Sequence, residues 1–68
     1  MTDSIRINGA AEPLIARSVA ELVAERSDTQ GRGVAVALNG AIVRRADWSS
    51  TPLKCGDMVE IVRAMQGG

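Results

Sequence analysis

Alternating polar and apolar residues open the chain. Residues 4–7 read Ser-Ile-Arg-Ile and are followed by Asn8 and Gly9, a pair that readily adopts the positive φ angles of a tight hairpin turn. This pattern predicts a strand, a turn and a return strand over residues 11–15. Pro13 removes a backbone donor from the return strand, which should therefore be short or lie at a sheet edge.

The next segment changes to a helical period. Ser18 and Glu21 have the spacing of a capping box, in which the hydroxyl and the carboxylate each satisfy a free amide at the helix start. Apolar residues follow at i, i+3 and i+4, on one helix face: Val19, Leu22 and Val23. We therefore expect a helix over 18–27, ended by the polar, glycine-bearing residues 28–33.

A second hairpin is predicted after the helix. Large and small apolar residues alternate over 34–38, Asn39 and Gly40 offer another tight turn, and residues 41–43 form the return strand. Residues 44–52 are expected to be a polar connection.

The last predicted strand, 58–62, follows a turn at Gly56 and Asp57. It is the natural central strand, because Val59 and Ile61 can pack on the helix while neighbours flank both of its edges. The element order favours an α+β roll, with a mixed sheet of about four to five strands and one main helix packed across it. We place this domain at residues 1–63.

Composition limits where the stability of the domain can come from. The chain has 68 residues, one cysteine and no histidine, so it can form neither an intrachain disulfide nor a zinc site with the usual ligands. The core must be aliphatic, because Trp48 is the only aromatic residue. We expect Trp48 to cover one end of this core, and we assign no role to Cys55, which has no histidine to act as its base.

Charge and hydropathy exclude two classes of partner. The 8 basic and 8 acidic residues cancel and are scattered along the chain, which disfavours binding to a nucleic-acid backbone. Residues 1–4 lack the features of a signal peptide, and no apolar run is long enough to span a bilayer. We expect a cytoplasmic protein with neither a nucleic-acid nor a membrane partner.

The candidate chemistry lies at residues 64–68, which we expect to be a flexible C-terminal tail. Gly67 and Gly68 have no Cβ, so they can enter a narrow slot in a partner and bring the Gly68 carboxylate to a reactive centre. An ionised carboxylate resists nucleophilic attack and needs activation, for example by adenylation. ATP and Mg²⁺ would belong to the activating enzyme, because this chain has no phosphate-cradling loop. The alternative is a disordered end with two incidental glycines.

No catalytic constellation accompanies this tail. Residues for serine-based hydrolysis, paired-carboxylate catalysis or cofactor binding are missing, so the chain should not be an enzyme. The sheet face away from the helix should carry small and apolar residues: Ala35, Ala37, Met58 and Val62. Exposed apolar patches tend to mark contacts, so these residues, with Met65 of the tail, are a candidate partner-docking surface. The alternative is that loops partly cover this face.

Short motifs spread over nearly the whole chain carry a family resemblance. They are Ser18, Val19, Glu21 and Leu22; residues 36–40; Ile42, Val43 and Arg45; Trp48; Gly56 and Asp57; and Gly67 and Gly68. In their order and spacing the chain resembles the ThiS sulfur carriers of thiamine biosynthesis, which have the ubiquitin-like β-grasp fold. One position departs, since many relatives have proline where Arg44 stands.

The resemblance implies a defined sequence of partners. A ThiF-like adenylyltransferase would activate Gly68, and a persulfide donor such as a cysteine desulfurase system would supply sulfur to form a thiocarboxylate. A ThiG-like thiazole synthase would receive that sulfur. Three alternatives stay open: a carrier of the molybdopterin-synthase small-subunit type, a ubiquitin-like modifier conjugated through Gly68, and a plain interaction domain.

Overall fold

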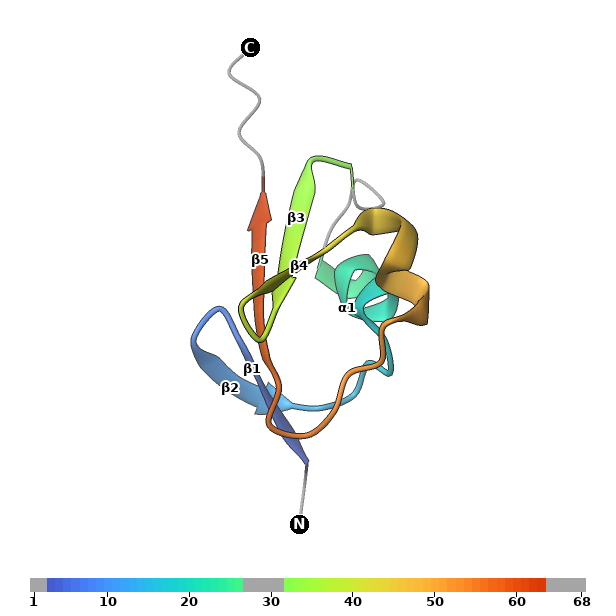
Figure 1. Ribbon diagram of the computed structural model, residues 1–68. Coiled ribbons are helices and arrows are strands. Elements are labelled where there is room, and N and C mark those ends of the chain that lie inside the picture. The colour runs from blue at the N-terminus through green and yellow to red at the C-terminus, as the bar shows by residue number, and fades with distance from the viewer. Residues whose placement is uncertain (1–2, 27–31, 64–68) are drawn as a thin grey trace.

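The computed structural model describes residues 3–26 and 32–63. Its elements follow in the order β1 (Ser4–Ile7), β2 (Ala10–Pro13), α1 (Val19–Arg26), β3 (Val34–Leu38), β4 (Ala41–Val43), the 3₁₀ helix η1 (Arg45–Ser50) and β5 (Met58–Arg63). The predicted order of strands and helix is confirmed. Figure 1 shows α1 and η1 on one side of the strands.

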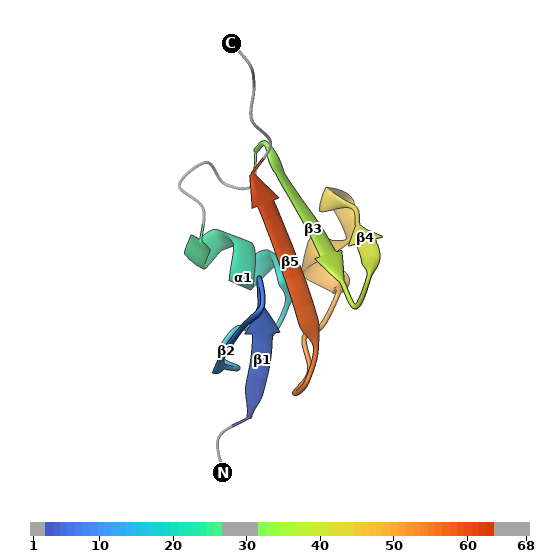
Figure 2. The same cartoon turned by 90° about the vertical axis from the view of Figure 1, so that its left-hand side faces the viewer.

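The strands form one mixed five-stranded sheet in the order β2-β1-β5-β3-β4. Strand β5 is central, as predicted. It runs parallel to β1, with Ile7 opposite Val59, and antiparallel to β3, with Val36 opposite Ile61. Figure 2 shows β5 crossing the molecule between these two neighbours.

Two Asn-Gly pairs make the hairpin turns that the sequence predicts. Asn8 and Asn39 both have φ 51°, and the glycines that follow them have φ 85° and 86°. These positive angles belong to the turn type whose twist matches that of the flanking strands. Both turns therefore follow from local sequence alone.

Strand β2 differs from the predicted return strand over 11–15. Because the turn has only two residues, Ala10 already pairs with Ile7, and the strand starts one residue earlier than expected. It ends at Pro13 on the edge of the sheet, where a missing backbone donor does no harm. Leu14 N–H still donates to the Asp3 carbonyl at 2.9 Å before the chain leaves the sheet.

Helix α1 begins with the predicted capping residues, with one change of partner. Ser18 Oγ accepts a hydrogen bond from the Glu21 N–H at 3.2 Å, and Glu21 Oε1 accepts one from Arg17 N–H at 3.0 Å. The carboxylate thus reaches one residue beyond the amide that a standard capping box uses. The expected last residue, Ser27, lies outside the described part of the chain.

The core lies between one sheet face and the two helices. Its buried residues come from strands, helices and connections: Ile5, Ile7, Ala16, Val19, Leu22, Val23, Val36, Trp48, Leu53 and Val59. The predicted apolar stripe of α1 is entirely within this set. Val59 is in the core and Ile61 packs against it, which confirms the inward face predicted for the last strand.

The prediction of a polar connection over 44–52 is incomplete, because residues 45–50 form η1. The tertiary structure stabilises this short helix: Trp48 is only 6% exposed, and its Nε1–H donates to the Val43 carbonyl at 2.9 Å. The core role predicted for Trp48 is confirmed. Arg44, the position that departs from the family resemblance, has φ −69° and ψ 146°, a backbone conformation that proline also adopts.

Candidate functional site

The predicted reactive residues lie outside the described part of the chain. This applies to Gly67 and Gly68 and to the tentative docking residue Met65. The structure instead describes the strand that leads toward them. Strand β5 ends at Arg63, and β3 pairs with it as far as that residue, with Val34 opposite Arg63.

The start of β5 is fixed by the second hairpin turn. Asn39 N–H donates to the Met58 carbonyl at 2.7 Å, and Asn39 Oδ1 accepts from the Met58 N–H at 3.0 Å. Asn39 Nδ2 also donates to Asp57 Oδ1 at 3.1 Å, while Asp57 Oδ2 accepts from Lys54 N–H at 2.8 Å. The turn before β5 is thereby tied to the turn between β3 and β4.

The four predicted surface residues lie on the sheet face away from α1. Met58 and Val62 are each 58% exposed, Ala35 is exposed and Ala37 is half-buried. Ala35 is directly opposite Val62 in the β3 and β5 register and Ala37 is opposite Glu60, so the four residues form a strip that Glu60 interrupts. The part of the chain that the structure describes leaves this strip open, and its docking role stays a prediction.

A fifth apolar residue belongs to the same face and was missed from the sequence. Ile42 of β4 is opposite Ala37 and is 73% exposed. The signal was available, because alternation along 41–43 places Ile42 on the face opposite to Val43, which packs on the core. We call Ala35, Ala37, Ile42, Met58 and Val62 the open face.

A shallow hollow of about 110 Å³ lies in the open face, beside four of its five residues. Ala35, Ala37, Ile42, Val62 and the acidic residue Glu60 line it. Glu60 is opposite Ala37 in the β3 and β5 register. The open face is therefore apolar with one carboxylate within it.

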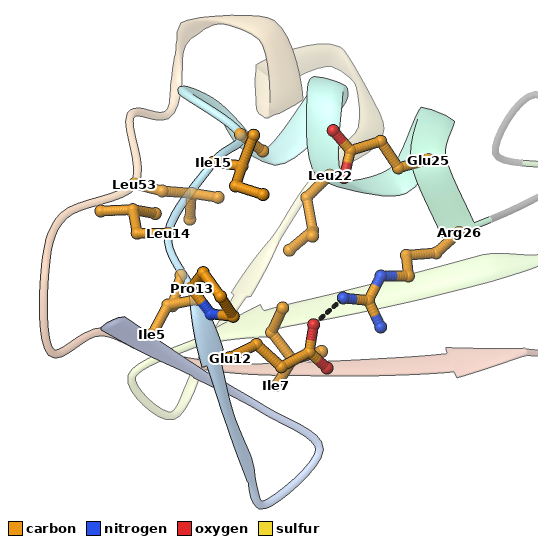
Figure 3. Close-up of a pocket in the computed structure, with 11 residues that line it drawn as sticks. Ile5, Ile7, Glu12, Pro13, Leu14, Ile15, Leu22, Glu25, Arg26 and Leu53 are labelled. Carbon is orange, nitrogen blue, oxygen red and sulfur yellow. Dashed lines mark hydrogen bonds and ion pairs between the residues drawn. The ribbon is translucent and has the colours of Figure 1, made fainter. Parts of the chain in front are cut away.

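A second hollow, of about 80 Å³, lies on the other side of the sheet, between β2 and α1 (Figure 3). Its floor is apolar core, including Ile5, Leu22 and Leu53. At its rim, Glu12 and Arg26 form a hydrogen-bonded ion pair, and this bond raises the pKa of the Arg26 guanidinium. The pair joins the edge strand to the end of the helix, which is a structural role.

Across residues 3–26 and 32–63, no group of three histidine, cysteine, aspartate or glutamate side chains is placed to hold a metal ion. Cys55, to which we assign no role, is exposed and unpaired in a turn. In the same part of the chain, the helices are too short to cross a membrane. The open face and the strand leading to the tail are what the structure offers to a partner.

Comparison with known proteins decides the family. The sequence profile of the ThiS family matches residues 5–68, which is nearly the whole chain. The chain belongs to the ThiS family.

Two ThiS proteins illustrate the relationship. The chain is 39% identical over 62 residues to the sulfur carrier protein ThiS of Thermus thermophilus, covering 91% of this chain and 95% of that protein. The crystal structure of the thiamine biosynthesis protein ThiS from Geobacter metallireducens superimposes with a TM-score of 0.77 at 34% identity. That match covers 96% of this chain and 99% of the other, so the predicted β-grasp fold is confirmed.

Proposed function

We propose that this chain is a sulfur carrier of thiamine biosynthesis that acts as a protein cosubstrate. The observation that carries the proposal is the match of the ThiS family profile through residue 68, the glycine predicted to react. The names of both similar proteins support it, since one is a sulfur carrier protein and the other a thiamine biosynthesis protein. They favour the thiamine pathway over the molybdopterin alternative.

The proposed chemistry takes place on the Gly68 carboxylate. A terminal carboxyl group has a pKa of about 3.3–3.7 and is therefore ionised at neutral pH. In this form its carbonyl carbon resists attack by a nucleophile. Attack of this carboxylate on the α-phosphate of ATP would release pyrophosphate and form an acyl adenylate. The terminal sulfur of a persulfide would then displace AMP and form an acyl disulfide on Gly68. Two thiol groups would reduce its S–S bond, forming a disulfide themselves, releasing the donor as a thiol and leaving a thiocarboxylate on Gly68.

Partner enzymes would carry out the steps for which this chain has no residues. ATP and Mg²⁺ would be bound by a ThiF-like adenylyltransferase, and a ThiG-like thiazole synthase would accept the sulfur. The five residues 64–68 span at most about 17 Å when extended, enough to enter a partner's cleft from the end of β5. Gly67, having no side chain, would allow access to a narrow slot. The chain itself would not be an enzyme.

The open face is the proposed docking surface for the adenylyltransferase. Three of its residues, Ile42, Met58 and Val62, are large apolar side chains that are more than half exposed. Burying them against a partner removes apolar area from water, which favours association. Val62 lies on the strand that leads to the tail, so docking there would hold the tail close to the enzyme.

Mass spectrometry tests the proposed function. The chain is incubated with its cognate adenylyltransferase, ATP and a sulfur source, and we expect the mass gain of exchanging one oxygen for sulfur, located on Gly68. Deleting Gly68, or adding one residue after it, should abolish the gain while the circular dichroism spectrum stays unchanged. A chain whose mass never changes under these conditions is not a sulfur carrier.

A further inference from the structure

An ionisable group lines the hollow of the open face. Glu60 lies on β5 between Met58 and Val62, and its side chain is exposed. In the β3 and β5 register it is opposite Ala37, which is in turn opposite Ile42 on β4. Glu60 therefore has apolar neighbours along its own strand and across the sheet toward β4.

A basic residue of the same face lies on the other side of β5. Arg6 is opposite Met58 on β1, and it lines a shallow hollow together with Met58 and Glu60. Its guanidinium donates to the Gly9 carbonyl at 3.3 Å, which directs the group toward the first hairpin turn. Arg6 is thus the internal candidate for pairing with Glu60, and any test has to separate it from a partner's cation.

A partner that covers the apolar neighbours also removes water from Glu60. A carboxylate that loses its hydration without gaining a partner destabilises the complex. Interface centres are accordingly poor in unpaired charge, and a desolvated carboxylate there is matched by an arginine or lysine. Glu60 lines the hollow of the open face together with Ala35, Ala37, Ile42 and Val62, so a partner that fills this hollow covers the carboxylate.

We propose that the enzyme docking on the open face presents an arginine or lysine to Glu60. This rests on the proposed function, in which that enzyme is the adenylyltransferase. The apolar residues would supply affinity, and Glu60 would supply selectivity, because a partner with a carboxylate or an apolar group at this point is rejected. Glu60 is then the specificity-determining residue of the docking surface.

The test measures the dissociation constant for the cognate adenylyltransferase without ATP, so that binding is read separately from chemistry. Glu60→Lys should raise the Kd about 30-fold or more, because like charges would face each other, and Glu60→Gln about 3- to 10-fold. Glu25→Lys is the matched control: it makes the same charge change at an exposed position of α1, on the other side of the sheet. It should leave the Kd within about twofold.

The internal pairing with Arg6 is separated by a double-mutant cycle. Glu60→Gln should raise the Kd by the same factor with Arg6 intact and in an Arg6→Gln background, because the cation that matters is on the enzyme. If the effect disappears in the Arg6→Gln background, or if Glu60→Lys behaves like Glu25→Lys, the proposal is wrong. Failure of the proposed function is distinct, since it would appear as a missing mass gain in the unsubstituted chain.

Discussion

The side-chain amide of Asn8 takes the place of a peptide group beside Ile61. Its Oδ1 accepts a hydrogen bond from the Ile61 N–H at 2.8 Å, and its Nδ2 donates to the Ile61 carbonyl at 3.3 Å. The Asn8 backbone N–H donates to the Val59 carbonyl at 2.9 Å, after which β1 turns away at Gly9. One side chain thus extends the parallel ladder of β1 and β5 by one step.

Removing this amide should weaken the end of β5. Asn8→Gly retains the positive φ angle but leaves both polar groups of Ile61 without their partner, so we expect the free energy of unfolding to fall by about 1–2 kcal/mol. Urea denaturation followed by Trp48 fluorescence measures the change. The control is a glycine substitution at an exposed position whose side chain makes no such hydrogen bonds. If Asn8→Gly lowers the free energy of unfolding no more than this control does, the amide does not have the proposed role.

Gly40 tests the backbone of the second hairpin. It has φ +86°, and a Cβ added there would meet nothing within 4 Å, so strain and not collision is the expected effect of a substitution. Gly40→Ala should lower the free energy of unfolding by about 1–2 kcal/mol. Gly40→Asn should be milder, because asparagine tolerates the left-handed region. Equal effects of the two substitutions in thermal denaturation would rule out this explanation.

Trp48 should be the most sensitive position of η1. Trp48→Phe removes the hydrogen bond to the Val43 carbonyl and leaves a gap in the core, which we expect to lower the free energy of unfolding by about 2–3 kcal/mol. A domain of this size has only roughly 3–5 kcal/mol in total. Circular dichroism should therefore show a markedly lower melting temperature, whereas Ser49→Ala, on the exposed side of η1, should melt like the unsubstituted chain.

The open face can be made polar without changing side-chain branching. The double substitution Ile42→Thr and Val62→Thr preserves β-branched residues and should leave the melting temperature nearly unchanged. It should weaken binding to the adenylyltransferase about tenfold, equivalent to about 1.4 kcal/mol. Ile15→Thr is the control, because Ile15 is 75% exposed but lies in the segment between β2 and α1. Equal loss of affinity in the control would exclude the open face as the docking surface.

The ion pair of Glu12 and Arg26 should contribute little. Both side chains are partly exposed, at 29% and 39%, and pairs of this kind stabilise by about 0–1 kcal/mol. Glu12→Gln should therefore lower the free energy of unfolding by less than about 1 kcal/mol at low salt, and the difference should vanish at about 1 M salt. A larger, salt-independent loss would indicate that Glu12 has a role in packing.

Local chemistry explains which parts of the fold were predictable from sequence. The two Asn-Gly turns, the Ser18 cap and the edge position of the strand with Pro13 each depend on a few neighbouring residues. Helix η1 was not predictable in this way, because a buried indole bonded to a neighbouring strand stabilises it. The start of β2 was misjudged by one residue, although a two-residue turn at Asn8 and Gly9 already places Ala10 opposite Ile7.

Only those parts of the candidate site that depend on local sequence patterns were predicted. Alternation in 34–38 and 58–62 placed four open-face residues correctly, while Ile42 was overlooked although its alternation with Val43 in the short strand 41–43 places it on the same face. The pairing of the Asn8 side chain with Ile61 joins residues 53 positions apart, which no local pattern reveals. Gly67 and Gly68 lie outside the described residues, so their roles stay proposals.

The central place of β5 makes closure of the sheet depend on the last strand of the chain that the structure describes. Each hairpin pairs internally, but in the sheet β1 and β3 meet only through β5. Hairpins form within about 1–10 μs, whereas joining strands distant in sequence is slower. An isolated hairpin is only marginally stable in water. We therefore expect that, during synthesis, the sheet closes only after the ribosome has released β5, since no other strand joins β1 to β3.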